Sequence, residues 1–151
     1  MNIKQFNDWL SSKDKQSLIM GILNVTPDSF SDGGQYFKKN TAIEHALEMV
    51  KNGADIIDIG GESTRPFADP VSLDEEISRV IPVIEGIRKK SDVCISIDTT
   101  KSIVASKALD VGASIINDVS AMEVDPLMAD IAIRCDCPLI IMHMKGTPKN
   151  M

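Results

Sequence analysis

Short apolar runs and longer amphipathic segments alternate along the chain. Runs of this length, rich in isoleucine and valine, are typical of strands that are buried on both faces of a parallel sheet. Between the runs, apolar residues recur three and four positions apart, which predicts helices with one buried face. We therefore expect strands at residues 18–23, 54–60, 93–97, 114–116 and 138–142.

Capping signals indicate where the helices begin. Thr41 and Glu44 have the spacing of a capping box, so we expect a helix from Thr41 and a long loop over residues 25–40 before it. Ser72 is also followed three residues later by a glutamate, and Pro82 would bend the helix that begins there. Shorter helical segments are expected at residues 101–110 and 125–134, with a lead-in helix or cap within residues 1–17.

The alternation of strands and helices predicts an α/β fold with a parallel sheet and helices outside it. A short internal repeat supports this division, because residues 53–58 (GADIID) resemble residues 112–117 (GASIIN). An open doubly wound sheet and a (β/α)₈ barrel both fit the pattern. No G-x-G-x-x-G turn is present in the sequence, which weakens the doubly wound alternative.

Composition and charge narrow the possible partners. The net charge of −6 disfavours a nucleic-acid surface, which needs clustered positive charge. No apolar run approaches the ~20 residues of a membrane span, and the first residues are polar, so we expect a cytoplasmic protein without a membrane partner. The three cysteines predict free thiols, and Cys135 and Cys137 lack a second pair with which to bind zinc.

A polar residue lies at or near the end of each expected strand. Because the carboxyl ends of barrel strands meet at one face, these side chains should converge where barrel active sites lie. Each has a simpler explanation when taken singly: Asp98 could cap the following helix, and Asn117 could form a turn with Asp118. The five residues are Asn24, Asp58, Asp98, Asn117 and His143.

The residue types at these positions suggest a ligand. Carboxylates accept hydrogen bonds and amides both donate and accept, so together they suit a flat heterocycle that is rich in N–H groups. The amide oxygen of Asn24 could bind Mg²⁺, which uses few protein oxygens together with substrate phosphates. Thr64 and Arg65 are candidate phosphate or carboxylate contacts. The residues alone thus predict a site for a polar heterocycle that carries a magnesium-bound phosphate.

Several long motifs closely resemble the dihydropteroate synthase family. They lie at residues 20–34, 58–66, 97–99, 116–119 and 142–148. The resemblance implies a TIM (β/α)₈ barrel enzyme of folate biosynthesis, a transferase. It would join 4-aminobenzoate to 6-hydroxymethyl-7,8-dihydropterin diphosphate through a cation-like pterin intermediate and release pyrophosphate.

The resemblance also implies roles for individual residues. Asn24 corresponds to a ligand of Mg²⁺ and diphosphate, and Asp32, Arg65 and Asp98 to the catalytic residues, with Asp32 stabilising the developing cation. Asp58 would support the site from behind. The substrate-binding residues would be Asp98, Asn117 and Met142 for the pterin, Thr64 and Arg65 for the diphosphate, and Phe30 and Pro66 for 4-aminobenzoate, where sulfonamides compete.

The chain is short for a whole barrel, which needs about 250 residues. We interpret residues 1–151 as a single pterin-binding domain, a partial barrel with about the first five strand–helix units, truncated before the last three. The resemblance also implies a homodimer, as in that family. We expect this chain alone to be inactive, because its outer strands would lack neighbours.

Two other functions remain open at this point. A pterin-binding methyltetrahydrofolate corrinoid methyltransferase could share Asp98 and Asn117. Residues 29–34 and 63–66 argue against it, because methyl transfer needs no contacts to a diphosphate. The third possibility is a non-catalytic fragment that serves only as a folding or binding piece.

Overall fold

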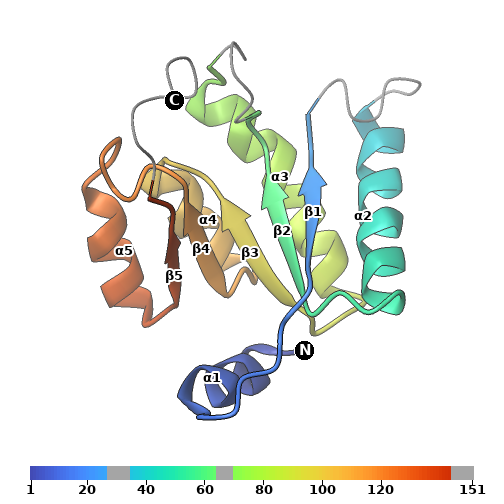
Figure 1. The fold of residues 1–151 in the computed structure, drawn as a ribbon. Helices are drawn as coiled ribbons and strands as arrows, with labels where there is room; N and C mark the ends of the chain where they lie inside the picture. Colours follow the sequence, from blue (N-terminus) through green and yellow to red (C-terminus); the bar gives the residue numbers. More distant parts are fainter. Residues whose placement is uncertain (27–34, 64–69, 144–151) are drawn as a thin grey trace.

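The computed structural model describes residues 1–26, 35–63 and 70–143, and strands and helices alternate along them (Figure 1). The strands are β1 (Met20–Asn24), β2 (Ile56–Gly60), β3 (Cys94–Asp98), β4 (Ile115–Asp118) and β5 (Leu139–Ile141). The helices are α1 (Ile3–Ser11), α2 (Gln35–Lys51), α3 (Leu73–Arg88), α4 (Ser102–Asp110) and α5 (Leu127–Cys135).

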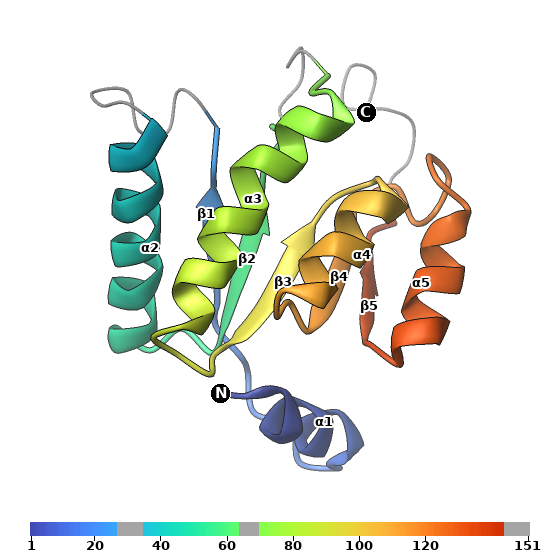
Figure 2. The same ribbon diagram turned by 180° about the vertical axis from the view of Figure 1, so that it is seen from behind.

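The strands form one parallel sheet in the order β1-β2-β3-β4-β5. Helices α2 to α5 cover one face of this sheet, as Figure 2 shows, and α1 lies at the end where the strands begin. Each strand pairs with its neighbours in sequence, as in a (β/α)₈ barrel, whereas a doubly wound sheet reverses its order. The parallel α/β prediction is confirmed, and the doubly wound alternative is excluded.

The main core lies between the sheet and the helices. Isoleucines on the helix-facing side of the strands pack against the apolar face of α3. The residues of that face are those that the helical spacing of apolar positions predicted. Burial is complete at the centre of this layer, which therefore fixes the sheet against its helices. Among the side chains with 0% exposure are Ile57, Ile59, Ile95, Ile97, Ile84 and Ile87.

Helix α1 confirms the expected lead-in helix and covers the amino end of the inner face of the sheet. Its first turn has a capping box, with Gln5 N donating to Asn2 Oδ1 at 3.0 Å and Asn2 N donating to Gln5 Oε1 at 2.8 Å. Phe6 is 5% exposed and packs into a second core cluster with Ile56, Cys94 and Ile115. All three cysteines are free, as predicted.

Helix α2 begins earlier than the sequence predicted. It starts at Gln35, so Thr41 lies inside the helix and does not cap it, and the loop after β1 is shorter than residues 25–40. Glutamine and lysine extend a helix without any apolar pattern, because their long side chains lose little rotamer freedom there. The helix does end as expected, with Gly53 in a positive-φ conformation (104°).

Helix α3 begins where the sequence predicted. Ser72 is its N-cap, and Ser72 Oγ accepts a hydrogen bond from the backbone N–H of Glu75 at 3.3 Å. The carboxylate of Glu75 pairs with Arg79, one turn further along the helix. Half of the capping box is therefore formed, and Pro82 lies inside the helix as expected.

Three strands end later than predicted, by one or two residues. Asn24 is the last residue of β1, Asp98 is the last residue of β3, and Asn117 lies within β4. Asp58 lies in the middle of β2. A polar residue on the inner face interrupts the apolar pattern without interrupting the backbone hydrogen bonds, so the pattern alone placed the strand ends too early.

Gly86 on α3 marks a close approach to α2. A Cβ there would lie 2.2 Å from Ile43 Cδ1 and 2.9 Å from Ile43 Cγ1. We expect Gly86→Ala to lower the free energy of unfolding by about 1–2 kcal/mol in urea denaturation, after the gain in helix propensity is included. Ile43→Val removes the nearest atom, so the double variant should lose less than the sum of the two single variants. A Gly86→Ala variant that matches the parent in stability would contradict this packing.

Candidate functional site

One register row of the sheet brings polar side chains together at the carboxyl ends of the strands. Asn24 pairs with Gly60, Gly60 with Asp98, and Asp98 with Asn117. Residues in one row share a face of the sheet, and successive residues along a strand alternate between faces. Ile59, which precedes Gly60, faces the helices. The row therefore lies on the inner face, at the strand ends opposite α1 (Figure 1).

Gly60 leaves space in the middle of this row. A Cβ at this position would lie 3.4 Å from Asp98 Oδ2 and 3.6 Å from Asn24 Oδ1. The two oxygens thus lie on either side of Gly60, which itself contributes no side chain to the row. Asn24 is exposed and Asp98 is half-buried. The predicted convergence of these two side chains is observed.

Asp58 lies one layer deeper on the same face. It is 3% exposed, and its Oδ2 accepts a hydrogen bond from Asn117 Nδ2 at 3.1 Å. Burial raises the pKa of Asp58, while the neighbouring polar side chains of Ser96 and Asn117 act in the opposite direction. Asp58 therefore supports Asn117 from below the row.

Asp98 has a strongly perturbed carboxyl group. Burial, followed by the charges of Asp58, Glu76, Asp118 and Glu62, raises the pKa of Asp98 from 3.8 to about 7. Near neutral pH the carboxyl is thus divided between its charged and neutral forms. It can accept a hydrogen bond from an N–H group of a ligand, or take up a proton. A perturbed group of this kind in a polar row is typical of a functional site.

Neither simpler explanation of these residues holds. The N-cap of α4 is Lys101, so Asp98 does not cap that helix. The turn after β4 is formed by Asp118, which accepts from Ser120 N at 2.9 Å and from Met122 N at 2.8 Å. The turn thus uses the carboxylate beside Asn117 and leaves the Asn117 amide on the inner face.

A cluster of charged side chains beside the row was not predicted from the sequence. Lys101 Nζ donates to Glu76 Oε2 at 2.6 Å and also pairs with Glu62. Glu76 is 0% exposed, and its Oε1 has no hydrogen-bond partner among the described residues. Only the positions of Glu62 and Lys101 in the sequence could have indicated this cluster, because each residue follows closely after the end of a strand.

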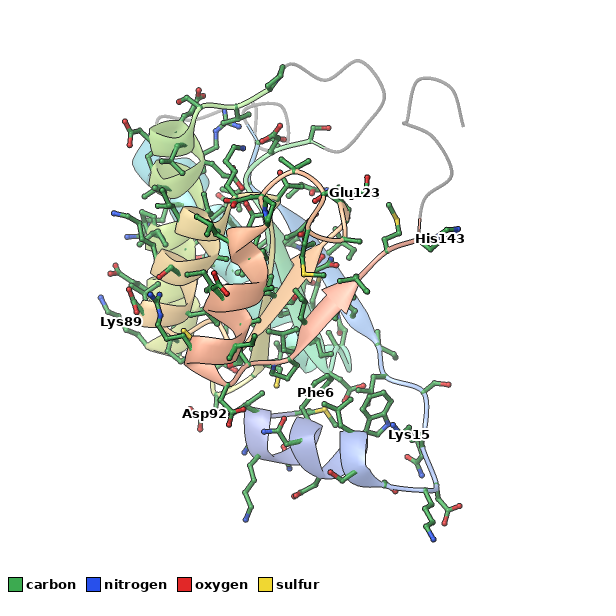
Figure 3. The ribbon with its side chains drawn as sticks, turned by 90° about the vertical axis from the view of Figure 1, so that its left-hand side faces the viewer. Phe6, Lys15, Lys89, Asp92, Glu123 and His143 are labelled. Carbon is green, nitrogen blue, oxygen red and sulfur yellow. The ribbon has the colours of Figure 1, made fainter. Side chains whose placement is uncertain are left out.

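The remaining predicted residues do not join the row. Met142 is 42% exposed beyond β5, and His143, also exposed, stands apart from the strand ends in Figure 3. The structure thus does not bring His143 into the expected group. Phe30, Asp32, Thr64, Arg65 and Pro66 lie outside the described residues.

Residues 1–26, 35–63 and 70–143 contain no group of three or more histidine, cysteine, aspartate or glutamate side chains placed to hold a metal ion. In the same ranges, no helix combines the length and apolar character needed to cross a bilayer.

Comparison with known proteins gives consistent matches. A family model described as "Pterin binding enzyme" matches residues 20–151. A Bacillus subtilis protein named dihydropteroate synthase is 59% identical over 134 residues, which are 89% of this chain and 47% of that protein. This chain thus spans about half the length of the curated relatives that it matches.

Solved structures extend the match to the fold. The dihydropteroate synthase of Clostridium difficile, determined in the presence of pteroic acid, is 49% identical with a TM-score of 0.83, over 91% of this chain and 52% of that one. The Xanthomonas albilineans dihydropteroate synthase with 4-aminobenzoic acid is 46% identical with a TM-score of 0.82, over 87% of this chain and 48% of that one. These matches confirm the predicted fold class, a partial barrel with parallel strands.

Proposed function

Because the chain belongs to the pterin binding enzyme family, as its motifs indicated, we propose that it forms the pterin-binding part of a dihydropteroate synthase. The reaction joins 6-hydroxymethyl-7,8-dihydropterin diphosphate to 4-aminobenzoate and releases pyrophosphate. The relatives named dihydropteroate synthase support this proposal.

The row of Asn24, Gly60, Asp98 and Asn117 is the observation that carries the proposal. A pterin ring is flat and presents amino and ring N–H groups along its edge. The Asp98 carboxylate and the Asn117 amide lie side by side on the inner face and supply acceptors for such an edge. Met142 would then contact the ring as part of the pocket wall.

A magnesium ion fits the chemistry of Asn24. This side chain ends in an amide oxygen, is exposed, and lies beside the gap above Gly60. Mg²⁺ is usually bound by one or two protein oxygens together with water and substrate phosphates, so a single amide oxygen is a suitable donor set. When bound, the ion would neutralise charge on the diphosphate leaving group.

The other residues of the reaction are assigned by the resemblance. Thr64 and Arg65 would bind the diphosphate, Phe30 and Pro66 would contact 4-aminobenzoate, and Asp32 would stabilise positive charge on the pterin. Asp98 would hold the ring, and its ionised form would favour the same positive charge. Exclusion of water would protect the cation until the weakly nucleophilic arylamine reacts with it.

Calorimetric titration of the 151-residue chain with the pterin diphosphate tests the proposal. We expect binding that Mg²⁺ strengthens at least tenfold, which is ~1.4 kcal/mol. Asn24→Ala should abolish the effect of Mg²⁺ and retain binding of a pterin without diphosphate. Pterin binding that is insensitive to Mg²⁺ would favour the methyltransferase, and absence of binding would favour the non-catalytic fragment; either result would overturn the proposal.

A further inference from the structure

The hydrogen bond between Asn117 and Asp58 crosses a strand. Asp58 lies on β2 and Asn117 on β4, with β3 between them. Strands are about 4.8 Å apart, so these two backbones are separated by ~10 Å and only side chains can bridge the gap. The β3 residue in the register row of Asp58 is Ser96, whose small side chain leaves room for this bridge.

The chemistry of Asp58 determines which atom of the Asn117 amide it contacts. An ionised carboxylate only accepts hydrogen bonds, so it must face the amide nitrogen and not the amide oxygen. The contact is indeed between Asn117 Nδ2 and Asp58 Oδ2, at 3.1 Å. Asn117 Oδ1 is then on the other end of the amide and is left to accept from a ligand. Without Asp58, the two orientations of the amide would differ little in energy.

Burial of the Asp58 carboxylate is energetically unfavourable, which indicates that this charge serves the site. The side chain is 3% exposed, and its Oδ1 has no hydrogen-bond partner among the described residues. An apolar side chain of similar volume would avoid this cost, because a buried carboxylate with few partners is unfavourable. The bridge to Asn117 is therefore a feature of the site and contributes little to stability.

We propose that Asp58 is a positioning residue that fixes the Asn117 amide and makes the site select a 2-amino over a 2-oxo pteridine. This inference rests on the proposed function. When Asn117 Oδ1 is held toward the ligand, the 2-amino group of a pterin donates a hydrogen bond to this oxygen. The 2-oxo group of a lumazine cannot donate, so two acceptor oxygens would face each other. A site built to receive a hydrogen bond disfavours an analogue that lacks the donor, because its polar group is left unpaired.

Fluorescence titration with 6-hydroxymethylpterin and 6-hydroxymethyllumazine tests this selection. We expect the parent chain to prefer the pterin by at least tenfold, and Asp58→Ala to reduce the preference to less than about threefold, because Asn117 can then turn its amide. The Asp58→Asn variant keeps the side-chain volume and should also lose selectivity, since its own amide can donate or accept. Asp92→Ala removes an exposed carboxylate at the opposite end of the sheet (Figure 3) and should leave the ratio unchanged.

A double variant and a ligand-free measurement complete the test. If Asp58 acts through Asn117, the Asp58→Ala, Asn117→Ala double variant should have the same ratio of pterin affinity to lumazine affinity as Asn117→Ala alone. In the ligand-free chain, NMR should show slow exchange of the Asn117 side-chain N–H protons, and faster exchange in Asp58→Ala. Unchanged selectivity in both Asp58 variants, or equally fast exchange in the parent, would overturn the inference. Failure of the parent to bind either pteridine would instead reject the proposed function, and the exchange measurement would still decide the role of Asp58.

Discussion

The Asp98→Asn variant is expected to bind a pterin about 100-fold more weakly than the parent and yet to unfold at a higher urea concentration. The weaker binding follows from the loss of a charged acceptor, whose hydrogen bonds are worth about 1.5–3 kcal/mol, and from an added NH₂ group that faces the N–H groups of the ligand. Calorimetry with 6-hydroxymethylpterin measures this loss. Asp92→Asn, the same change at an exposed position, should leave the affinity unaltered.

The gain in stability follows from the pKa of Asp98. Burial and four neighbouring carboxylates raise this pKa from 3.8 to about 7. Between these two values the folded chain holds a proton that the unfolded chain has released, so the free energy of unfolding falls as the pH rises from about 4 to about 7. The full difference corresponds to at most ~4 kcal/mol, and partial exposure of Asp98 reduces it to about 1–2 kcal/mol.

The pH dependence separates this effect from a general change in packing. Asparagine does not ionise, so the variant should exceed the parent in stability at pH 8 and match it more closely at pH 4. Pterin binding by the parent should strengthen as the pH rises through about 7, because the carboxylate form accepts the ligand's hydrogen bonds. A constant difference in stability from pH 4 to pH 8 would contradict this assignment.

The Lys101→Met variant is expected to lose about 3–5 kcal/mol of the free energy of unfolding. Lys101 is the cation that pairs with both Glu62 and Glu76, and Glu76 is 0% exposed. Burial lowers the pKa of Lys101 and the two carboxylates raise it, with a net increase, so Lys101 stays charged at neutral pH. Without Lys101, the Glu76 carboxylate would be buried without a counter-charge.

A second substitution identifies the cause of that loss. In the Lys101→Met, Glu76→Gln double variant the buried charge is absent, so much of the lost stability should return in urea denaturation. Lys89→Met alters a lysine at the end of α3 that is exposed (Figure 3) and should change stability by less than about 0.5 kcal/mol. Equal losses in the single and double variants would show that the effect comes from packing of the lysine stem and not from charge.

The fold was predictable because its pattern is local. Apolar runs and capping signals predicted the order of the elements, and the polar residues after each run indicated the carboxyl ends. Asn24, Asp98 and Asn117 were recognised for this reason, although they belong to the strands themselves. The start of α2 was wrong because residues 35–40 carry no apolar period, and a helix can form there without one.

The contacts that tune the site were not predictable, because they join residues far apart in the sequence. Lys101 meets Glu62 and Glu76 only because the chain returns to the same end of the sheet after each helix. Asp58 and Asn117 occupy equivalent positions in the repeated segments 53–58 and 112–117, so their similarity was visible in the sequence. Their hydrogen bond could not be predicted, because it depends on the small Ser96 between them and on the register of three strands.

Helix α1 restricts access to any site on the inner face. With Phe6 packed against Ile56, Cys94 and Ile115, the amino end of that face is closed. A ligand that binds at the level of Asp98 therefore cannot approach from the end of the sheet where the strands begin, and its route of entry is set by the opposite end of the molecule.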